Sequence, residues 1–304
     1  MSTVGFSKGD SSATYTSFRG GGILANYNKS PMNYIGNKYR LLKQIQPLFP
    51  KQVNKFVDLF CGGCDITINV EANEKYANDI NYHVIEIFET MQSKSADEIL
   101  QHIDNRIAEY SLSKENEQGY KEFRKYYNKT KNPLDLYTLM CFSFNYQFRF
   151  NSAHEYNNAF GRNRSCFNDR MRNNLTKFIP LIRDIQYSKK EFQDFDFSIL
   201  SADDFVYADP PYLLAWGVYN DRGGFLGWKD KQEYQLLNVL DELNKRNVKF
   251  ALSNVIEHKG QTNDILVNWS KNYNVIPLDF NYNNASYHGK NTDKITKEVL
   301  ITNY

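Results

Sequence analysis

The spacing of apolar residues predicts a chain in which short buried strands alternate with helices. Runs rich in Val, Ile, Phe and Tyr, which are typical of buried strands, occur at residues 55–60, 75–78, 205–208, 249–254, 275–276 and 298–301. Helical spacing is found from residue 82 to about residue 127, and helices are also predicted at residues 133–140, 170–177, 230–243 and 264–270. This alternation predicts a doubly wound α/β sheet.

Several segments carry more local signals. Residues 1–30 are rich in Ser, Thr, Gly and Asn without periodicity, which predicts a flexible arm. Residues 144–151 alternate aromatic and polar side chains as a strand does, and with residues 160–164 they predict a hairpin. An apolar helix is expected to start at Ile66. Asp230 with Glu233 resembles a helix capping box.

The composition is that of a folded protein with one or two structural units. A chain of 304 residues, 41% of them hydrophobic, can bury a substantial core and can hold either one large α/β domain or a core with an inserted module. No apolar run reaches membrane-spanning length, and residues 1–10 lack a signal-peptide pattern, so we expect a cytoplasmic protein. Cys61 and Cys64 have CxxC spacing, but they lack the second pair or the histidines that a zinc site requires.

The net charge of +2 conceals an uneven distribution along the chain. Residues 110–190 hold 15 Lys and Arg against 7 Asp and Glu, a net charge of +8, whereas the remainder carries −6. A basic module in an acidic scaffold is typical of a protein that binds a polyanion such as nucleic acid. The charges alone leave open a second interpretation, which is an ordinary solvated helical surface.

The segment Asp209-Pro210-Pro211-Tyr212 directly follows the predicted strand at residues 205–208. Because neither proline can donate a backbone hydrogen bond, the strand must end there in a stiff turn. Asp209 is therefore expected at the carboxyl end of a strand, where open α/β sheets bind their ligands. A carboxylate, a rigid carbonyl group and an aromatic ring can hold a planar base by its exocyclic amine. The alternative is a tight turn whose aspartate merely caps the strand end.

Features around the first two strands suggest a nucleoside-containing cofactor. The strand at residues 55–60 runs into a glycine turn, which lets a ligand approach the backbone closely, but a GxGxxG pyrophosphate cradle is absent. Asp79 follows the second strand and could accept hydrogen bonds from ribose hydroxyls. Tyr34 and Lys38 lie in a turn that could cover a cofactor. These features fit S-adenosylmethionine, although helix caps and an ordinary helix entry could also explain them.

The predicted hairpin and the helix after it carry residues suited to DNA. Polar and basic side chains on a β-ribbon can read base edges, and a basic helix can contact phosphates. A solvated surface hairpin is the alternative interpretation. The predicted DNA-contact residues are Phe144, Gln147, Arg149, Asn151, Arg162, Asn163, Arg164, Arg170, Arg172 and Lys177.

Four segments of the chain form an ordered set: Tyr34-Ile35-Gly36-Asn37-Lys38, Phe56-Val57-Asp58-Leu59-Phe60-Cys61-Gly62-Gly63, Ala77-Asn78-Asp79-Ile80 and Asp209-Pro210-Pro211-Tyr212. This set resembles the motifs of Dam-type (D12 class) DNA adenine-N6 methyltransferases, most closely those of T-even-type bacteriophages. Further similarity at residues 127–130, 252–258 and 298–301 extends the resemblance over about residues 31–304.

The resemblance implies a Rossmann-like, S-adenosylmethionine-dependent methyltransferase core at residues 31–90 and 190–304, with a DNA-recognition domain at residues 91–189. It implies a site-specific enzyme of the bacterial or phage-infected host cytoplasm that methylates N6 of a flipped adenine in double-stranded DNA, without a metal. The implied catalytic residues are Asp209, Pro210, Pro211 and Tyr212. The implied cofactor-binding residues are Tyr34, Lys38, Asp58, Phe60, Asp79 and Asp209.

The predicted hairpin departs from the phage enzymes at one position that concerns specificity. Where those enzymes have Pro-Phe-Gly-Lys-Arg, this chain has Ala159-Phe160-Gly161-Arg162-Asn163. Asn163 therefore replaces an arginine expected to hold a guanine, and the expected target is GATC or a related short site. Cytosine-N4 methylation, which also uses an exocyclic amine, and a DNA-binding module without turnover are the alternatives.

Overall fold

The computed structural model describes residues 27–215, 227–279 and 296–304. Most of the predicted arm at residues 1–30 lies outside them. The strands are β1 (Lys55–Asp58), β2 (Glu74–Asn78), β3 (Ile185–Ser188), β4 (Phe205–Ala208), β5 (Lys249–His258), β6 (Gln261–Thr262), β7 (Asn274–Leu278) and β8 (Thr296–Thr302). The α-helices are α1 (Leu42–Ile45), α2 (Tyr82–Gln92), α3 (Ala96–Glu109), α4 (Glu117–Thr130), α5 (Pro133–Phe142), α6 (Asp169–Phe178), α7 (Asp230–Lys245) and α8 (Asp264–Ser270).

The described strands form one sheet in the order β3-β2-β1-β4-β5-β8-β7, with β6 paired to β5. Strands β3, β2, β1, β4 and β5 are parallel, whereas β8 is antiparallel to both β5 and β7. The chain order reverses between β1 and β4, which creates the crevice where sheets of this kind bind ligands. The predicted doubly wound, Rossmann-like α/β fold is confirmed.

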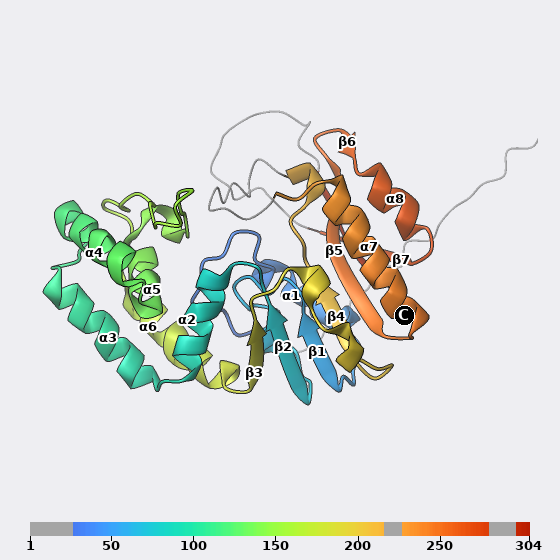
Figure 1. The fold of residues 1–304 in the computed structure, drawn as a ribbon, viewed down its shortest axis with the longest axis horizontal. Coiled ribbons are helices and arrows are strands. Elements are labelled where there is room, and N and C mark those ends of the chain that lie inside the picture. The colour runs from blue at the N-terminus through green and yellow to red at the C-terminus, as the bar shows by residue number, and fades with distance from the viewer. Residues whose placement is uncertain (1–26, 216–226, 280–295) are drawn as a thin grey trace, which may run out of the picture.

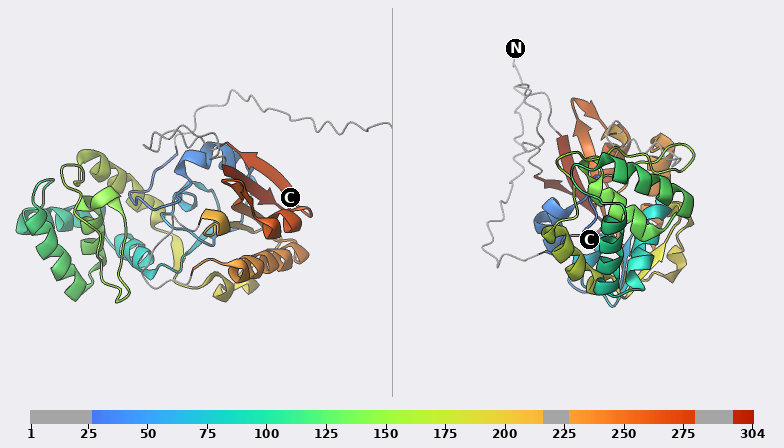
Figure 2. Two further views of the ribbon diagram at one scale, coloured as in Figure 1. Left: turned by 90° about the horizontal axis from the view of Figure 1, so that it is seen from above. Right: turned by 90° about the vertical axis from the view of Figure 1, so that its left-hand side faces the viewer.

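Alternating side chains on the central strands bury both faces of the sheet. Phe56 and Phe205 pack on one face with α1, whereas Val57 and Val206 pack on the other with α7 and α8. Figure 2 shows α1 and α7 on opposite sides of the sheet. The helix predicted at residues 230–243 is α7, which buries Leu236, Leu237, Leu240 and Leu243. Both faces of the central strands are therefore covered, which explains their continuous apolar sequence.

Helices α3–α6 lie together at one end of the molecule, with α2 between them and the sheet (Figure 1). Helix α5 is buried at every position from Leu134 to Phe142, and Pro133 begins it with a preset φ. These helices share one hydrophobic core with Ala77 of β2 and Ile185 of β3. Strand β3 belongs to the central sheet, although its residues fall within the predicted DNA-recognition domain at residues 91–189. The division of the chain into domains stays a prediction.

Two local predictions are wrong because of backbone conformation. The helix expected from Ile66 is only a 3-10 turn, Thr67–Asn69. The strand expected at residues 144–151 is a turn and an irregular loop, held to its return segment by isolated bridges. Asn145 and Tyr146 both have positive φ, 55° and 56°, which a strand cannot accommodate.

The capping box predicted from Asp230 and Glu233 is displaced by one residue. Helix α7 has Lys229 as its N-cap residue, and the backbone N–H of Lys229 donates to Gln232 Oε1. Glu233 is instead buried and accepts hydrogen bonds from Trp228, Asn254 and Asn263. Glu233 therefore stabilises the protein interior and does not cap the helix.

In the described part of the chain, no helix combines the length and apolar character needed to cross a bilayer. The same residues contain no cluster of three or more side chains that could hold a metal ion. Cys61 and Cys64 are buried free thiols next to the glycine turn.

Candidate functional site

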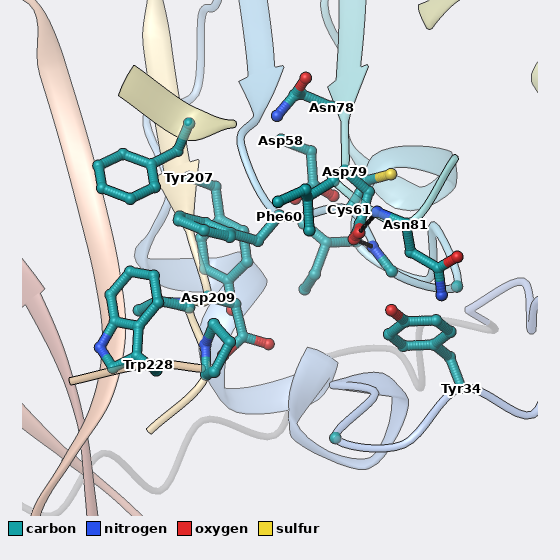
Figure 3. Close-up of a pocket in the computed structure, with 18 of the residues that line it drawn as sticks. Tyr34, Asp58, Phe60, Cys61, Asn78, Asp79, Asn81, Tyr207, Asp209 and Trp228 are labelled. Atoms are coloured by element: carbon teal, nitrogen blue, oxygen red, sulfur yellow. Dashed lines mark hydrogen bonds between the residues drawn. The ribbon is translucent and has the colours of Figure 1, made fainter. Parts of the chain in front are cut away.

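A cavity of about 420 Å³ lies at the carboxyl ends of β1, β2 and β4. Its volume is that of a small-molecule site. Every predicted catalytic or cofactor-binding residue lines it: Tyr34, Lys38, Asp58, Phe60, Asp79, Asp209, Pro210, Pro211 and Tyr212. Figure 3 shows Asp58, Asp79 and Asp209 below the ends of their strands, around one space. The sheet therefore brings together the motifs that the sequence spaces far apart.

Asp79 holds the glycine turn in place. Its Oδ2 accepts a hydrogen bond from the backbone N–H of Gly62 at 2.9 Å, and its Oδ1 accepts one from the N–H of Asn81 at 2.8 Å. Burial raises the pKa of Asp79, although these two donors oppose the shift. The carboxylate thus links the loop after β1 to the loop after β2 and still lines the cavity.

Asp58, at the end of β1, presents a buried oxygen to the cavity. Its Oδ2 accepts a hydrogen bond from Thr67 Oγ1 at 2.6 Å, whereas its Oδ1 has no hydrogen-bond partner among the described residues. Burial raises the pKa of Asp58 to about 7. A buried acceptor without a donor is costly, so this atom is suited to a ligand that supplies a hydrogen.

Three aromatic rings form an apolar side of the cavity. The ring centroids of Phe60, Phe192 and Trp228 lie 5.5 to 5.7 Å apart. The indole N–H of Trp228 donates to Glu233 Oε2 at 2.6 Å, which fixes the ring orientation. We did not predict Phe192 and Trp228 as site residues, because they lie outside any motif. A planar heterocycle fits such a wall.

A polar cluster joins Asp209, which is partly buried, to the buried side chains of Lys38, Tyr212 and Glu298. Lys38 Nζ lies 2.7 Å from Asp209 Oδ2 and 3.6 Å from Glu298 Oε1. The Tyr212 hydroxyl lies 3.0 Å from Asp209 Oδ1 and 2.8 Å from Glu298 Oε1. Burial raises the pKa of Asp209 to about 6, although the Lys38 ammonium opposes the shift.

Sequence reasoning assigned Glu298 to a strand but not to the site. Because β8 runs antiparallel to β5, its first residues lie at the edge of the sheet where β4 and β5 end. Glu298 can reach Tyr212 for this reason. An isolated acid before an apolar strand gives no local signal of such a position.

The predicted DNA-contact residues fall into two groups in the segment 144–164 and on α6. Phe144 is 44% exposed, and Arg149, Asn163 and Arg164 are also exposed. Gln147 is half-buried. Helix α6 presents Arg170 and Lys177 to solvent. These residues are available to a large partner.

Three of the predicted DNA-contact side chains already have partners within the chain. Asn151 accepts hydrogen bonds from the N–H groups of Ala153 and Glu155, so it stabilises the loop. Arg162 pairs with Glu117, and Arg172 binds both oxygens of Asp104 at 2.6 and 3.0 Å. Their roles in DNA binding stay predictions, and the two arginines would have to exchange partners.

Comparison with known proteins adds to this geometry. Residues 34–284 match the family of D12 class N6 adenine-specific DNA methyltransferases. The chain is 53% identical over 281 residues to the Type II methyltransferase M.FokI of Planomicrobium okeanokoites, and 51% identical over 283 residues to the modification methylase StsI of Streptococcus sanguinis. Each match covers 91% of this chain and 43% of the relative.

A third relative is the modification methylase LlaI of Lactococcus lactis subsp. lactis, 35% identical over 280 residues, covering 91% of this chain and 44% of that protein. The chain therefore spans less than half the length of these relatives.

Proposed function

Since the chain belongs to the D12 class of N6 adenine-specific DNA methyltransferases, we propose that it transfers a methyl group from S-adenosylmethionine to N6 of adenine in duplex DNA. The observation that carries the proposal is the position of Asp209-Pro210-Pro211-Tyr212 in the same cavity as Asp58 and Asp79. One end of this cavity suits a nucleoside cofactor, and the other suits an amine-bearing base.

The cavity residues fit S-adenosylmethionine, which when bound supplies a methyl group on a positively charged sulfur. The unpartnered Oδ1 of Asp58 can accept a hydrogen from the cofactor's ammonium group. The rings of Phe60, Phe192 and Trp228 can pack against its adenine, and Asp79 can accept hydrogens from its ribose. Tyr34 and Lys38 line the cavity from the turn before α1, and the sequence resemblance assigns both to the cofactor.

The 209–212 segment can orient the substrate base. The Asp209 carboxylate and the Pro210 carbonyl would accept the two hydrogens of the amine, so that its lone pair faces the methyl group. Asp209 must be ionised to do so. The ring of Tyr212 would stack on the extruded base and recover part of the few kcal/mol that flipping costs. Cytosine-N4 transfer would use the same groups, and the family match favours adenine.

The module that contains α3–α6 and the segment 144–164 is proposed to bind the DNA duplex. Its net positive charge and its exposed Phe144, Arg149 and Arg164 support this role. Within this segment, Asn163 replaces the arginine that the sequence resemblance leads us to expect. The resemblance favours GATC, and the replaced arginine favours a relaxed outer base. We therefore propose that the target is GATC or a short site that shares its central AT.

The biological setting is a finer part of the proposal. The sequence resemblance favoured the Dam enzymes of T-even-type phages, whereas the relatives that are about half identical to this chain are Type II and modification methylases. These names support a role in protecting host DNA within a restriction–modification system.

The proposed function is tested by incubating the protein with tritiated S-adenosylmethionine and mixed-sequence DNA. We expect label in DNA, N6-methyladenine on hydrolysis, and a short recurring site when methylation is mapped by sequencing. DNA binding without label would favour the module without turnover, and labelled N4-methylcytosine would contradict the choice of base. Methylation at sites without a central AT would contradict the role assigned to residues 144–164.

Neutral substitutions on α6 are expected to weaken binding to all DNA sequences about equally. Arg170→Ala and Lys177→Ala should each lower the slope of log K against log salt by about 0.9, if each side chain neutralises one phosphate. Fluorescence anisotropy at several salt concentrations measures this slope. Lys245→Ala on α7 is the matched control, because it removes an exposed lysine far from the module. A changed sequence preference with an unchanged salt slope would show that the phosphate role is wrong.

A further inference from the structure

Glu298 is a second buried carboxylate in the proposed transfer site. Its side chain is 3% exposed, and it enters the site from β8, on the far side of β5 from Asp209. Oε1 of Glu298 is the atom that meets both Tyr212 and Lys38. The sequence resemblance assigned this residue to no role, although burying a carboxylate requires compensation.

The number of hydrogens in this cluster limits how it can be bonded. The Tyr212 hydroxyl lies within hydrogen-bonding distance of Asp209 Oδ1 and of Glu298 Oε1, but a phenol carries only one hydrogen. It can therefore donate to only one of the two carboxylates at a time. The contact with Glu298 is the shorter one, 2.8 against 3.0 Å.

The choice between these two acceptors affects the substrate. If Tyr212 donated to Asp209, its hydrogen would occupy Oδ1 while Lys38 occupies Oδ2. The amine of the base would then have to share Oδ1 with the tyrosine hydrogen, which weakens each of the two hydrogen bonds. If Tyr212 donates to Glu298, Asp209 Oδ1 is left to accept the amine. The tyrosine ring is then also tethered at its far end.

We propose that Glu298 is a positioning residue of the methyl-transfer site: it takes the hydroxyl hydrogen of Tyr212, which orients the ring and leaves Asp209 Oδ1 to the substrate amine. This inference rests on the proposed function. Glu298 acts through Tyr212 and Asp209 and does not itself touch the base.

Glu298 also adds a negative charge beside Asp209. Among the described residues, the charged and titratable groups that face Asp209 are Lys38, which lowers its pKa, Glu298, which raises it, and Tyr212, which lowers it only when its hydroxyl donates to Asp209. Asp58 and Tyr207 face it from β1 and β4. Because transfer requires ionised Asp209, activity of the wild-type protein should fall as the pH drops through about 6. Removing the charge of Glu298 should lower the pKa of Asp209 and move this loss to lower pH.

The test measures kcat, KM for DNA and the pH profile for the full chain and its variants. We expect Glu298→Gln, which keeps the shape of the side chain and a weaker acceptor, to lower kcat about tenfold, and Glu298→Ala about a hundredfold, with little change in KM for S-adenosylmethionine. The acid limb of the profile should shift downward in Glu298→Gln. The matched control is Glu257→Gln, which removes a carboxylate of the neighbouring strand that pairs with Lys297.

A double-mutant cycle shows whether Glu298 acts through the tyrosine hydroxyl. Tyr212→Phe keeps the ring and removes the hydroxyl, so adding Glu298→Ala to it should cost little more activity. The inference would be overturned, with the function left intact, if the losses in kcat of the two single variants multiplied in the double variant. It would also be overturned if Glu298→Gln had the kcat of the wild type and lost activity at the same low pH. A wild-type protein that labels no DNA would overturn both. Thermal unfolding identifies variants that lose activity because they misfold. If Glu298→Ala is one of them, the kcat and the pH profile of Glu298→Gln decide the outcome.

Discussion

Replacing Asp209 with alanine is expected to lower methyl transfer by about 10³-fold, because one preorganised group at a reacting centre typically accounts for 10² to 10³ in kcat. The alanine cannot accept the hydrogens of the amine, so the nitrogen lone pair is no longer directed. Lys38 keeps Glu298 as a partner at 3.6 Å in this variant, so its buried charge stays compensated. The measurement is the single-turnover rate at which the tritiated methyl group is transferred to DNA at pH 7.5.

DNA affinity should hardly change in Asp209→Ala, because the carboxylate serves the amine and contacts no phosphate in the proposed complex. Asp203→Ala is the matched control: Asp203 lies just before the opposite end of β4 and is exposed. It should retain wild-type turnover. Substantial turnover by Asp209→Ala would overturn the mechanism, and an equal loss in the control would point to damage of the strand.

Replacing Gly62 with alanine is expected to weaken S-adenosylmethionine binding about tenfold or more, which corresponds to about 1.4 kcal/mol. Gly62 has φ +46°, and a Cβ there would lie 2.7 Å from Tyr34 Cδ1. Either the Tyr34 ring or the glycine turn must move, and both line the cavity. The turn is also bound to Asp79 through the Gly62 N–H. Isothermal titration calorimetry with the cofactor measures the loss.

Gly260→Ala separates the steric clash from backbone strain. Gly260 also has positive φ, +77°, but a Cβ there would have nothing within 4 Å. It lies in the turn between β5 and β6, outside the cavity. The control variant should lose some stability and keep its cofactor affinity. If both variants bind the cofactor as the wild type does, the close approach of Gly62 to Tyr34 has no role in binding.

Local sequence patterns predicted most of the sheet and one side of the site. A buried strand followed by two prolines placed Asp209 at a strand end, because proline cannot continue the hydrogen-bonded ladder. Parallel strands present their carboxyl ends at one edge of a sheet, so Asp58, Asp79 and Asp209 had to meet there once the strands were recognised. The ordered motifs then identified the family before any geometry was known.

The failed strand at residues 144–151 shows where periodicity misleads. Phe148 and Phe150 alternate with polar residues and are buried, as in a strand, but they pack into the core of the helical module. Phe150 stacks on His83 of α2, with ring centroids 4.0 Å apart. The alternation of apolar and polar residues indicates only which side chains are buried. It does not indicate the positive φ of Asn145 and Tyr146, which excludes a strand.

The sequence by itself determined the motif residues and most of the strands and helices, although not β3, because hydrophobic period and proline chemistry act over a few neighbouring positions. Tertiary structure alone decided which distant residues complete the site. Trp228 joins it because Glu233 holds its indole, and Glu298 joins it because β8 runs antiparallel beside β5. Such contacts depend on strand direction and on packing across the sheet, which no local pattern encodes.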